Sequence, residues 1–234
     1  MTASKKSTLI STFATLLSLV VLARPSAAQS YSAAGDFSSA SNPNGAWSYG
    51  SSTTLASAFI PYTTPTNNLG GLGFNGWLGT TPDSTPFVLR NTNTHIAANG
   101  SGIYQPGQLG LHPGPQDQFS IVRWTAPFSG TFAINATFSG LANVGTTTDV
   151  HILFDGISIF NSNVNGNPSP TSFATNRTVI AGDRIDFVVG FGSNGNYQDD
   201  TTGLSATIVP EPATLALVAM GLAGLFSVRF FKRK

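Results

Sequence analysis

The chain has 234 residues, of which 41% are hydrophobic and only 9% charged, and its formal net charge is +1. An ordinary soluble domain carries about 25% charged residues, so the composition is unusual, although its apolar content is sufficient for a core. The absence of cysteine excludes disulfides and cysteine-based zinc, iron–sulfur or thiol chemistry. This length allows one large domain or two small ones.

Residues 1–28 have the pattern of a secretory signal peptide. Lys5 and Lys6 precede a short apolar stretch from Phe13 to Ala23, and small residues follow up to Ala28. A positive start, a short apolar core and small residues at the cleavage site define such peptides. The apolar core is too short for a membrane-spanning helix. We therefore expect export, with cleavage after Ala28.

The body of the chain, residues 29–208, is acidic. It contains four arginines, nine aspartates and neither lysine nor glutamate, which gives a formal charge of −5. The basic residues that raise the net charge of the whole chain lie at its two ends. Nucleic acid is disfavoured as a partner, because phosphate binding needs a basic surface.

Alternation of apolar and polar residues predicts β-strands in the body. The pattern is clearest at 131–138, 149–155 and 184–189, and weaker at 55–60, 86–90, 118–124, 157–160, 177–180 and 203–208. Asp155-Gly156 between two apolar runs predicts a type I′ hairpin turn. Many short strands without a helical period favour an all-β fold, an antiparallel β-sandwich forming one domain over 29–208. We expect the irregular segment 31–85 to pack on this sandwich.

Part of the body resembles jelly-roll carbohydrate-binding modules. A strand candidate that ends in Ala126-Pro127 leads through a glycine turn into Gly130-Thr131-Phe132, and Ala181-Gly182-Asp183 precedes a late strand. These turns recur in such modules, and the resemblance implies a jelly-roll-like fold more than a particular ligand.

Aromatic residues in glycine-, asparagine- and proline-rich segments are candidates for sugar binding, because rings stack on the apolar faces of sugars. The main candidates are Trp47, Tyr49 and Trp77, with Tyr62, Tyr104 and Tyr197 in similar segments. The alternative is that these rings pack over the ends of the sandwich. Trp124 lies in a strand candidate and is expected in the core.

The oxygen-rich segment 192–203 is a candidate calcium site. Asp199 and Asp200 would supply carboxylate ligands for a structural Ca²⁺, which prefers oxygen donors. The alternative is an ordinary polar surface loop. No other cofactor is expected.

Signals of catalysis are weak. The body contains no Gly-x-Ser-x-Gly elbow and no His-x-x-x-His pair. We expect a protein that is not an enzyme, with a carbohydrate-active enzyme that uses aspartates as the alternative. Ice binding is a more remote alternative, because it would need a flat, regular array of threonines, and the threonines of this sequence are scattered.

The C-terminal segment 209–234 has three parts. Val209, Pro210, Glu211 and Pro212 are followed by an uncharged run over 213–228 and then by a basic tail over 229–234 that contains Arg229, Lys232, Arg233 and Lys234. The uncharged run would span about 24 Å as a helix, short of a bilayer core of about 30 Å, and Phe230 and Phe231 extend its apolar surface. We expect a transmembrane helix there, with the basic tail in the cytoplasm.

This three-part pattern resembles the PEP-CTERM sorting signal of exported proteins in Gram-negative bacteria that carry an exosortase. The resemblance implies processing by exosortase near Pro210 to Pro212, after transient anchoring in the inner membrane. It also implies release to the cell surface or the extracellular matrix. We therefore expect a structural or binding protein associated with exopolysaccharide or biofilm.

Overall fold

A computed structural model describes residues 29–211 of the chain. These residues form strands and two short 3-10 helices, in the following order. The elements are β1 (Tyr31–Ser32), β2 (Trp47–Ser52), β3 (Ile60–Pro61), β4 (Thr64–Thr66), η1 (Leu69–Gly71), β5 (Phe74–Leu78), β6 (Phe87–Asn91), β7 (Ala97–Asn99), β8 (Gly102–Tyr104), β9 (Leu109–His112), β10 (Phe119–Thr125), β11 (Gly130–Gly140), β12 (Thr147–Phe154), β13 (Ile157–Asn165), β14 (Thr171–Val179), β15 (Arg184–Gly190), η2 (Gly192–Asn194) and β16 (Thr202–Pro210).

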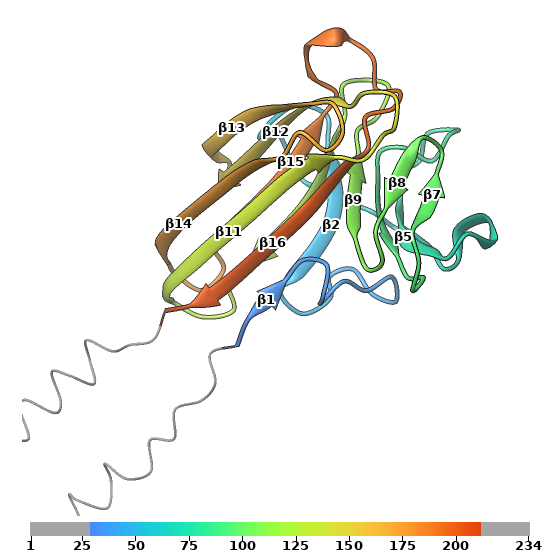
Figure 1. The fold of residues 1–234 in the computed structure, drawn as a ribbon. Helices are drawn as coiled ribbons and strands as arrows, with labels where there is room; N and C mark the ends of the chain where they lie inside the picture. Colours follow the sequence, from blue (N-terminus) through green and yellow to red (C-terminus); the bar gives the residue numbers. More distant parts are fainter. Residues whose placement is uncertain (1–28, 212–234) are drawn as a thin grey trace, which may run out of the picture.

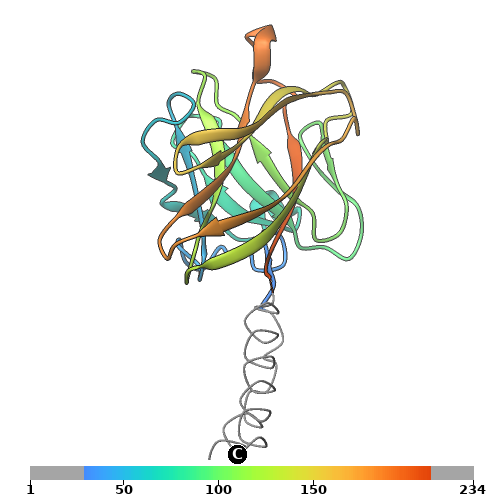
Figure 2. The same ribbon diagram turned by 90° about the vertical axis from the view of Figure 1, so that its left-hand side faces the viewer.

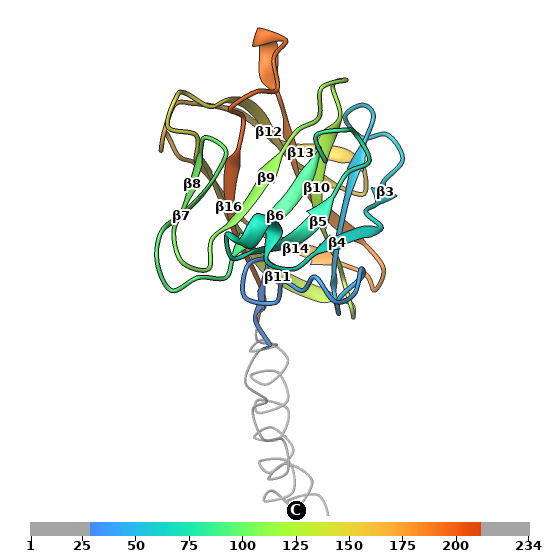
Figure 3. The same cartoon turned by 90° about the vertical axis from the view of Figure 1, so that its right-hand side faces the viewer.

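The strands form two large antiparallel sheets (Figures 1 and 3). The first sheet has the order β14-β11-β16-β9-β6-β5-β4, and β1 also pairs with β16. The second has the order β13-β12-β15-β10-β2-β3, and β7 and β8 form a separate hairpin. The prediction of an all-β, antiparallel fold is confirmed.

The two sheets share one apolar core. Trp124 of β10 contacts Phe132 of β11 edge to face, with ring centroids 5.1 Å apart, and Trp47 of β2 lies 6.3 Å from Phe187 of β15. Residues of β11 alternate as the sequence predicts, with Phe132, Ile134 and Phe138 buried. The expected core position of Trp124 is also confirmed.

The clear period-2 segments all form strands, but the N-terminal third differs from expectation. The predicted strand at 55–60 is mostly turn, and only Ile60 enters β3. The segment 31–85 is irregular only in part, for example over 36–44. It contributes β2 and β3 to the second sheet, and β1, β4 and β5 to the first. The Asp155-Gly156 turn has positive φ at both residues, as a type I′ turn requires.

Strand β16 connects the two poles of the sandwich. It begins at Thr202, beside β9, and ends at Pro210, beside Phe132 of β11. Tyr31 of β1 pairs with Ile208, so both ends of the described chain leave the domain at the same pole (Figures 1 and 2). The nine residues of β16 separate the poles by about 26 Å, at about 3.3 Å per residue.

Within residues 29–211, no helix is long and apolar enough to cross a membrane. The expected signal peptide (1–28) and the expected transmembrane helix (213–228) lie outside the described residues.

Candidate functional site

The rings expected to bind sugar are buried. Trp47, Tyr49 and Trp77 are 1%, 0% and 5% exposed, so the expectation that they form an exposed stacking surface is wrong. Both tryptophans lie in strands that have neighbours on each side, and segment 36–44 covers them. The indole N–H of Trp47 donates to Asp36 at 3.2 Å, and that of Trp77 donates to the Ser38 carbonyl at 2.8 Å.

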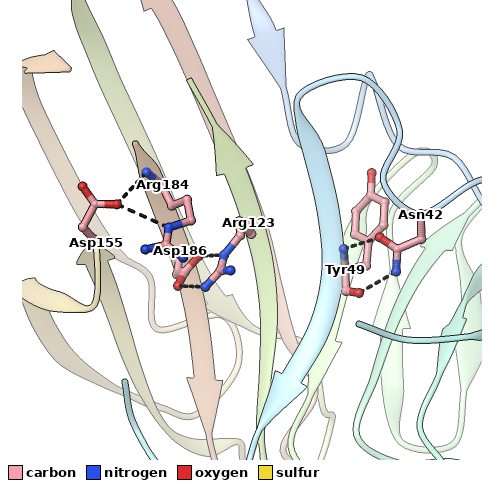
Figure 4. Close-up of polar contacts among 6 residues, drawn as sticks. All are labelled: Asn42, Tyr49, Arg123, Asp155, Arg184 and Asp186. Atoms are coloured by element: carbon pink, nitrogen blue, oxygen red, sulfur yellow. Dashed lines mark hydrogen bonds and ion pairs between the residues drawn. The ribbon is translucent and has the colours of Figure 1, made fainter. Parts of the chain in front are cut away.

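The backbone of Tyr49 is held from the same segment. The Asn42 side chain accepts a hydrogen bond from the Tyr49 N–H at 2.9 Å and donates to the Tyr49 carbonyl at 2.6 Å (Figure 4). The ring of Tyr49 lies 4.9 Å from that of Phe37, and burial raises the pKa of its hydroxyl. Tyr62 and Tyr104 are buried as well. Tyr197 alone of the six aromatic candidates is partly exposed.

Tyr197 lies in a cleft of about 300 Å³ at the pole opposite the chain ends. The cleft is formed by the β5–β6 loop, the β7–β8 turn, the end of β9 and the loop before β16. It is lined by Asp83, Thr85, Phe87, Asn99, Gly100, Ser101, His112, Tyr197, Gln198, Asp199 and Thr201. Asp83 and Tyr197, which are hydrogen-bonded to each other in the cleft, lie 114 residues apart in the sequence, so only the fold brings them together.

Three aromatic rings form a connected group in the cleft. The imidazole of His112 stacks on the ring of Phe87, with centroids 4.9 Å apart. Tyr197 meets His112 edge-on at 6.0 Å. Phe87 and Tyr197 are both partly exposed, so the group presents apolar ring surface to the cleft.

Asp83 fixes Tyr197 across the cleft. The Tyr197 hydroxyl donates to Asp83 Oδ2 at 2.8 Å, and this bond joins the β5–β6 loop to the loop before β16. The other oxygen, Oδ1, accepts from the hydroxyls of Thr81 and Thr85. These hydrogen bonds, that of Thr81 most strongly, hold the pKa of Asp83 well below its usual range. Asp83 is therefore an anion at neutral pH.

His112 is neutral and presents an acceptor. Its Nδ1 lies 2.7 Å from the Pro113 carbonyl oxygen. Because a carbonyl only accepts hydrogen bonds, Nδ1 carries the proton, and Nε2 keeps its lone pair. The side chain is 8% exposed, and burial lowers its pKa against the opposing effect of Asp83 and Asp199.

Asp199 and Asp200 face different surroundings. Asp199, at a positive φ of 62°, lines the cleft. Asp200 is fully buried, and its Oδ1 accepts from the N–H and hydroxyl of Thr147 at 2.8 and 3.2 Å. Asp200 thus anchors the loop before β16 to β12. Its Oδ2 is buried without a partner, and burial raises its pKa to about 6.

The donors expected for calcium are few. Over residues 29–211, no group of three or more His, Asp or Glu side chains has the arrangement of a metal site. A Ca²⁺ ion at Asp199 and Asp200 would depend on two carboxylates and on neutral oxygens. The calcium site remains a prediction that the structure does not test.

A second surface, the outer face of β14, β11 and β16, is uncharged. Its outward positions are Ser172, Ala174, Asn176 and Thr178 on β14, Thr131, Ala133, Asn135, Thr137 and Ser139 on β11, and Ser205, Thr207 and Val209 on β16. Hydroxyls pair across the strands, Thr131 with Thr178 at 3.0 Å and Thr137 with Ser172 at 2.8 Å. Ala133 and Asn135 interrupt the threonines on β11, so a regular threonine row is not formed there.

The sorting motif begins inside the folded domain. Val209 and Pro210 are the last residues of β16, paired with Ala133 and Phe132. The Glu211 N–H then donates to the Thr131 carbonyl at 2.8 Å. Pro212 and the basic residues Arg229, Lys232, Arg233 and Lys234 lie outside the described residues.

Residues 209–234 match the family model described as the PEP-CTERM protein-sorting motif. The chain therefore carries this motif, which implies an exported protein that is transiently anchored in the membrane and processed by exosortase. No protein of curated function matches the chain.

Among solved structures, the chain is weakly similar to carbohydrate-binding-module β-sandwiches. One is the CBM51 module from Clostridium perfringens GH95 in complex with methyl-galactose, at 12% identity over 68% of this chain and 99% of that chain, with a TM-score of 0.33. Another is a family 35 carbohydrate-binding module from Clostridium thermocellum, at 12% identity over 62% and 98% of the two chains, with a TM-score of 0.27.

The raised pKa of Asp200 gives a testable pH dependence. Its folded-state pKa of about 6 lies above the unfolded value of about 3.9. As pH rises from 4 to 7, the unfolded chain loses this proton first, so the domain should lose roughly 2 kcal/mol of stability over this range. In Asp200→Asn this loss should disappear, because an amide keeps the bonds to Thr147 without a buried charge.

Chemical denaturation at a series of pH values measures this effect as the difference in the free energy of unfolding between the variant and the wild type. Asp117→Asn, at an exposed aspartate that also has a positive φ, is the control and should leave the profile unchanged. A profile for Asp200→Asn that parallels the wild type would contradict the assigned role of Asp200.

The position of the motif predicts where processing occurs. Near its end β16 is paired with β11 on one side and β1 on the other, so its backbone up to Pro210 is held within a sheet. A protease needs a locally unpaired, extended segment. After co-expression with exosortase, intact-mass spectrometry should therefore find a mature C-terminus at Glu211 or later. A C-terminus at Pro210 or earlier would contradict this.

Proposed function

We propose that this chain is a non-enzymatic surface or extracellular-matrix protein of a Gram-negative bacterium that binds an exopolysaccharide of the envelope or biofilm. The binding site is the cleft that contains Phe87, His112 and Tyr197. The observation that supports this most strongly is a ring-lined polar cleft at the pole farthest from the sorting motif.

The contents of the cleft suit a sugar. Its volume of about 300 Å³ lies at the lower end of ligand sites, enough for one or two sugar rings of a longer chain. The partly exposed rings of Phe87 and Tyr197 supply stacking surface. Amides and hydroxyls of Asn99, Gln198 and Ser101 supply hydrogen-bonding groups.

The position of the cleft suits a protein that is anchored before it is released. The motif begins at the end of β16, and the cleft lies at the start of that strand, about 26 Å away. A chain held at the membrane by its C-terminal segment would therefore present the cleft to the outside. Binding to matrix polysaccharide would be available both before and after processing.

The alternative of an aspartate-dependent hydrolase has one supporting feature, since Asp83 and Asp199 line the same cleft. A glycosidase also needs a carboxylic acid that is protonated near neutral pH. The lowered pKa of Asp83 is the opposite of what a general acid requires. His112 cannot take that role either, because its lowered pKa leaves the imidazole neutral near neutral pH. These properties favour binding without hydrolysis.

Affinity electrophoresis tests the binding function. The full chain, in a detergent without a sugar headgroup, would be run in gels that contain a neutral, an acidic or an amine-bearing polysaccharide. We expect its migration to be retarded by at least one of these three classes. Tyr197→Ala should weaken that retardation roughly ten-fold, because it removes stacking surface and the bond to Asp83.

Phe128→Ala is the matched control, since Phe128 is 44% exposed in the β10–β11 loop at the opposite pole and should have no effect. Absence of retardation on every polysaccharide, or equal effects of the two variants, would refute the proposal.

A further inference from the structure

We infer that the cleft selects polysaccharides whose sugars carry protonated amino groups, over N-acetylated and uronate-containing chains. This inference rests on the proposed function, because it specifies the ligand of the same cleft. It follows from the charge, the hydrogen-bonding groups and the rings that line the site.

The charge of the cleft is negative and uncompensated. Asp83 and Asp199 line it, and none of its lining residues is an arginine or lysine. A uronate carboxylate would meet like charges there, whereas an ammonium group would meet opposite ones.

The arginines of the described chain are engaged elsewhere. Arg123 pairs with Asp186 at 2.6 Å and Arg184 with Asp155 at 3.4 Å, both on the second sheet (Figure 4). Arg177 lies over the ring of Phe154, and Arg90 donates to the Gly107 carbonyl. None of them is placed to neutralise the two carboxylates of the cleft.

His112 adds an acceptor that lacks a donor. Its side chain is more than nine-tenths buried, and its Nδ1–H is committed to the Pro113 carbonyl. Within residues 29–211, no hydrogen bond reaches Nε2, although the ring lines the cleft. The Nε2 atom itself is not fully buried, so a ligand group in the cleft that donates a hydrogen bond can reach this acceptor.

An ammonium group fits these features together. It carries a positive charge and three donors and has no acceptor, which matches two carboxylates and a neutral imidazole nitrogen. The rings of Phe87 and Tyr197 would contact the sugar face and add a cation–π attraction. N-acetylation keeps the sugar ring but removes the charge and most of the donors, so it isolates the contribution of the amine.

Isothermal titration calorimetry with three oligosaccharides of equal length tests the inference on the full chain in a detergent without a sugar headgroup. The probes are a β-1,4-linked glucosamine hexamer, its fully N-acetylated form and a glucuronate-containing hexamer, at pH 6 and low salt. We expect the amine form to bind roughly ten-fold more tightly than the acetylated form. The preference should shrink as salt rises, since screening weakens exposed charge pairs.

Asp199→Asn is the sharpest variant. Asparagine tolerates the positive φ of this position, and no hydrogen bond of the Asp199 side chain within residues 29–211 would be lost. It should reduce the amine preference to about three-fold or less while leaving binding of the acetylated form unchanged. Asp155→Asn, at an aspartate outside the cleft, should keep the full preference.

The outcomes separate the two proposals. If the acetylated or uronate form binds as tightly as the amine form, the inferred selectivity is wrong and the proposed binding function stands. If none of the three binds and no polysaccharide retards the chain, both are wrong. An amine preference that Asp155→Asn abolishes and Asp199→Asn preserves would place the charge selection outside the cleft and overturn the inference.

Discussion

The pairing of β16 with its neighbours is the constraint on which the other features depend. Its nine residues pair with β11 along their whole length, from Gly140 opposite Thr202 to Phe132 opposite Pro210. β9 occupies the other edge near its start, and β1 near its end. One strand therefore holds the loop that bears Tyr197 and Asp199 at one pole and the first residues of the sorting motif at the other. The sorting motif and the candidate binding site therefore lie at opposite ends of the same strand.

Burial determines which polar and aromatic groups remain for a ligand. The three tryptophans are within the core or close against it, where their surface stabilises the packing of the two sheets. The ring surface left at the cleft belongs to Phe87 and Tyr197.

Ion pairing likewise determines which charges remain for a ligand. Arg123 and Arg184 are paired with aspartates on the second sheet, and Asp83 and Asp199 are left without a cation in the cleft. Low overall charge thus coexists with a local concentration of negative charge.

The sequence predicted well what depends on contiguous pattern. The alternation at 131–138 is visible because β11 has one face in the core and one in solvent. The sorting motif is a linear signal and was fully predictable. Strands such as β2 and β5 were missed because small residues occupy some of their buried positions, Gly50 and Ser52 in β2 and Gly76 in β5, so the apolar alternation is interrupted. The burial of Trp47 and Trp77 depends on segment 36–44 lying over them, and no local pattern encodes that cover. The cleft could not be foreseen, since it joins Asp83, His112 and Tyr197 from three distant parts of the chain, although Tyr197 and Asp199 were singled out individually.

The claim that the distal cleft is the binding site is tested most directly by mapping a bound oligosaccharide on the protein. Isotope-labelled full chain would be titrated with the glucosamine hexamer while backbone amide resonances are followed by NMR. We predict that the shifts cluster at 83–87, 99–101, 112 and 197–201, the segments that line the cleft. Shifts confined to the uncharged outer face of β14, β11 and β16, or to the surroundings of Arg123 and Asp186, would contradict the assignment of the site.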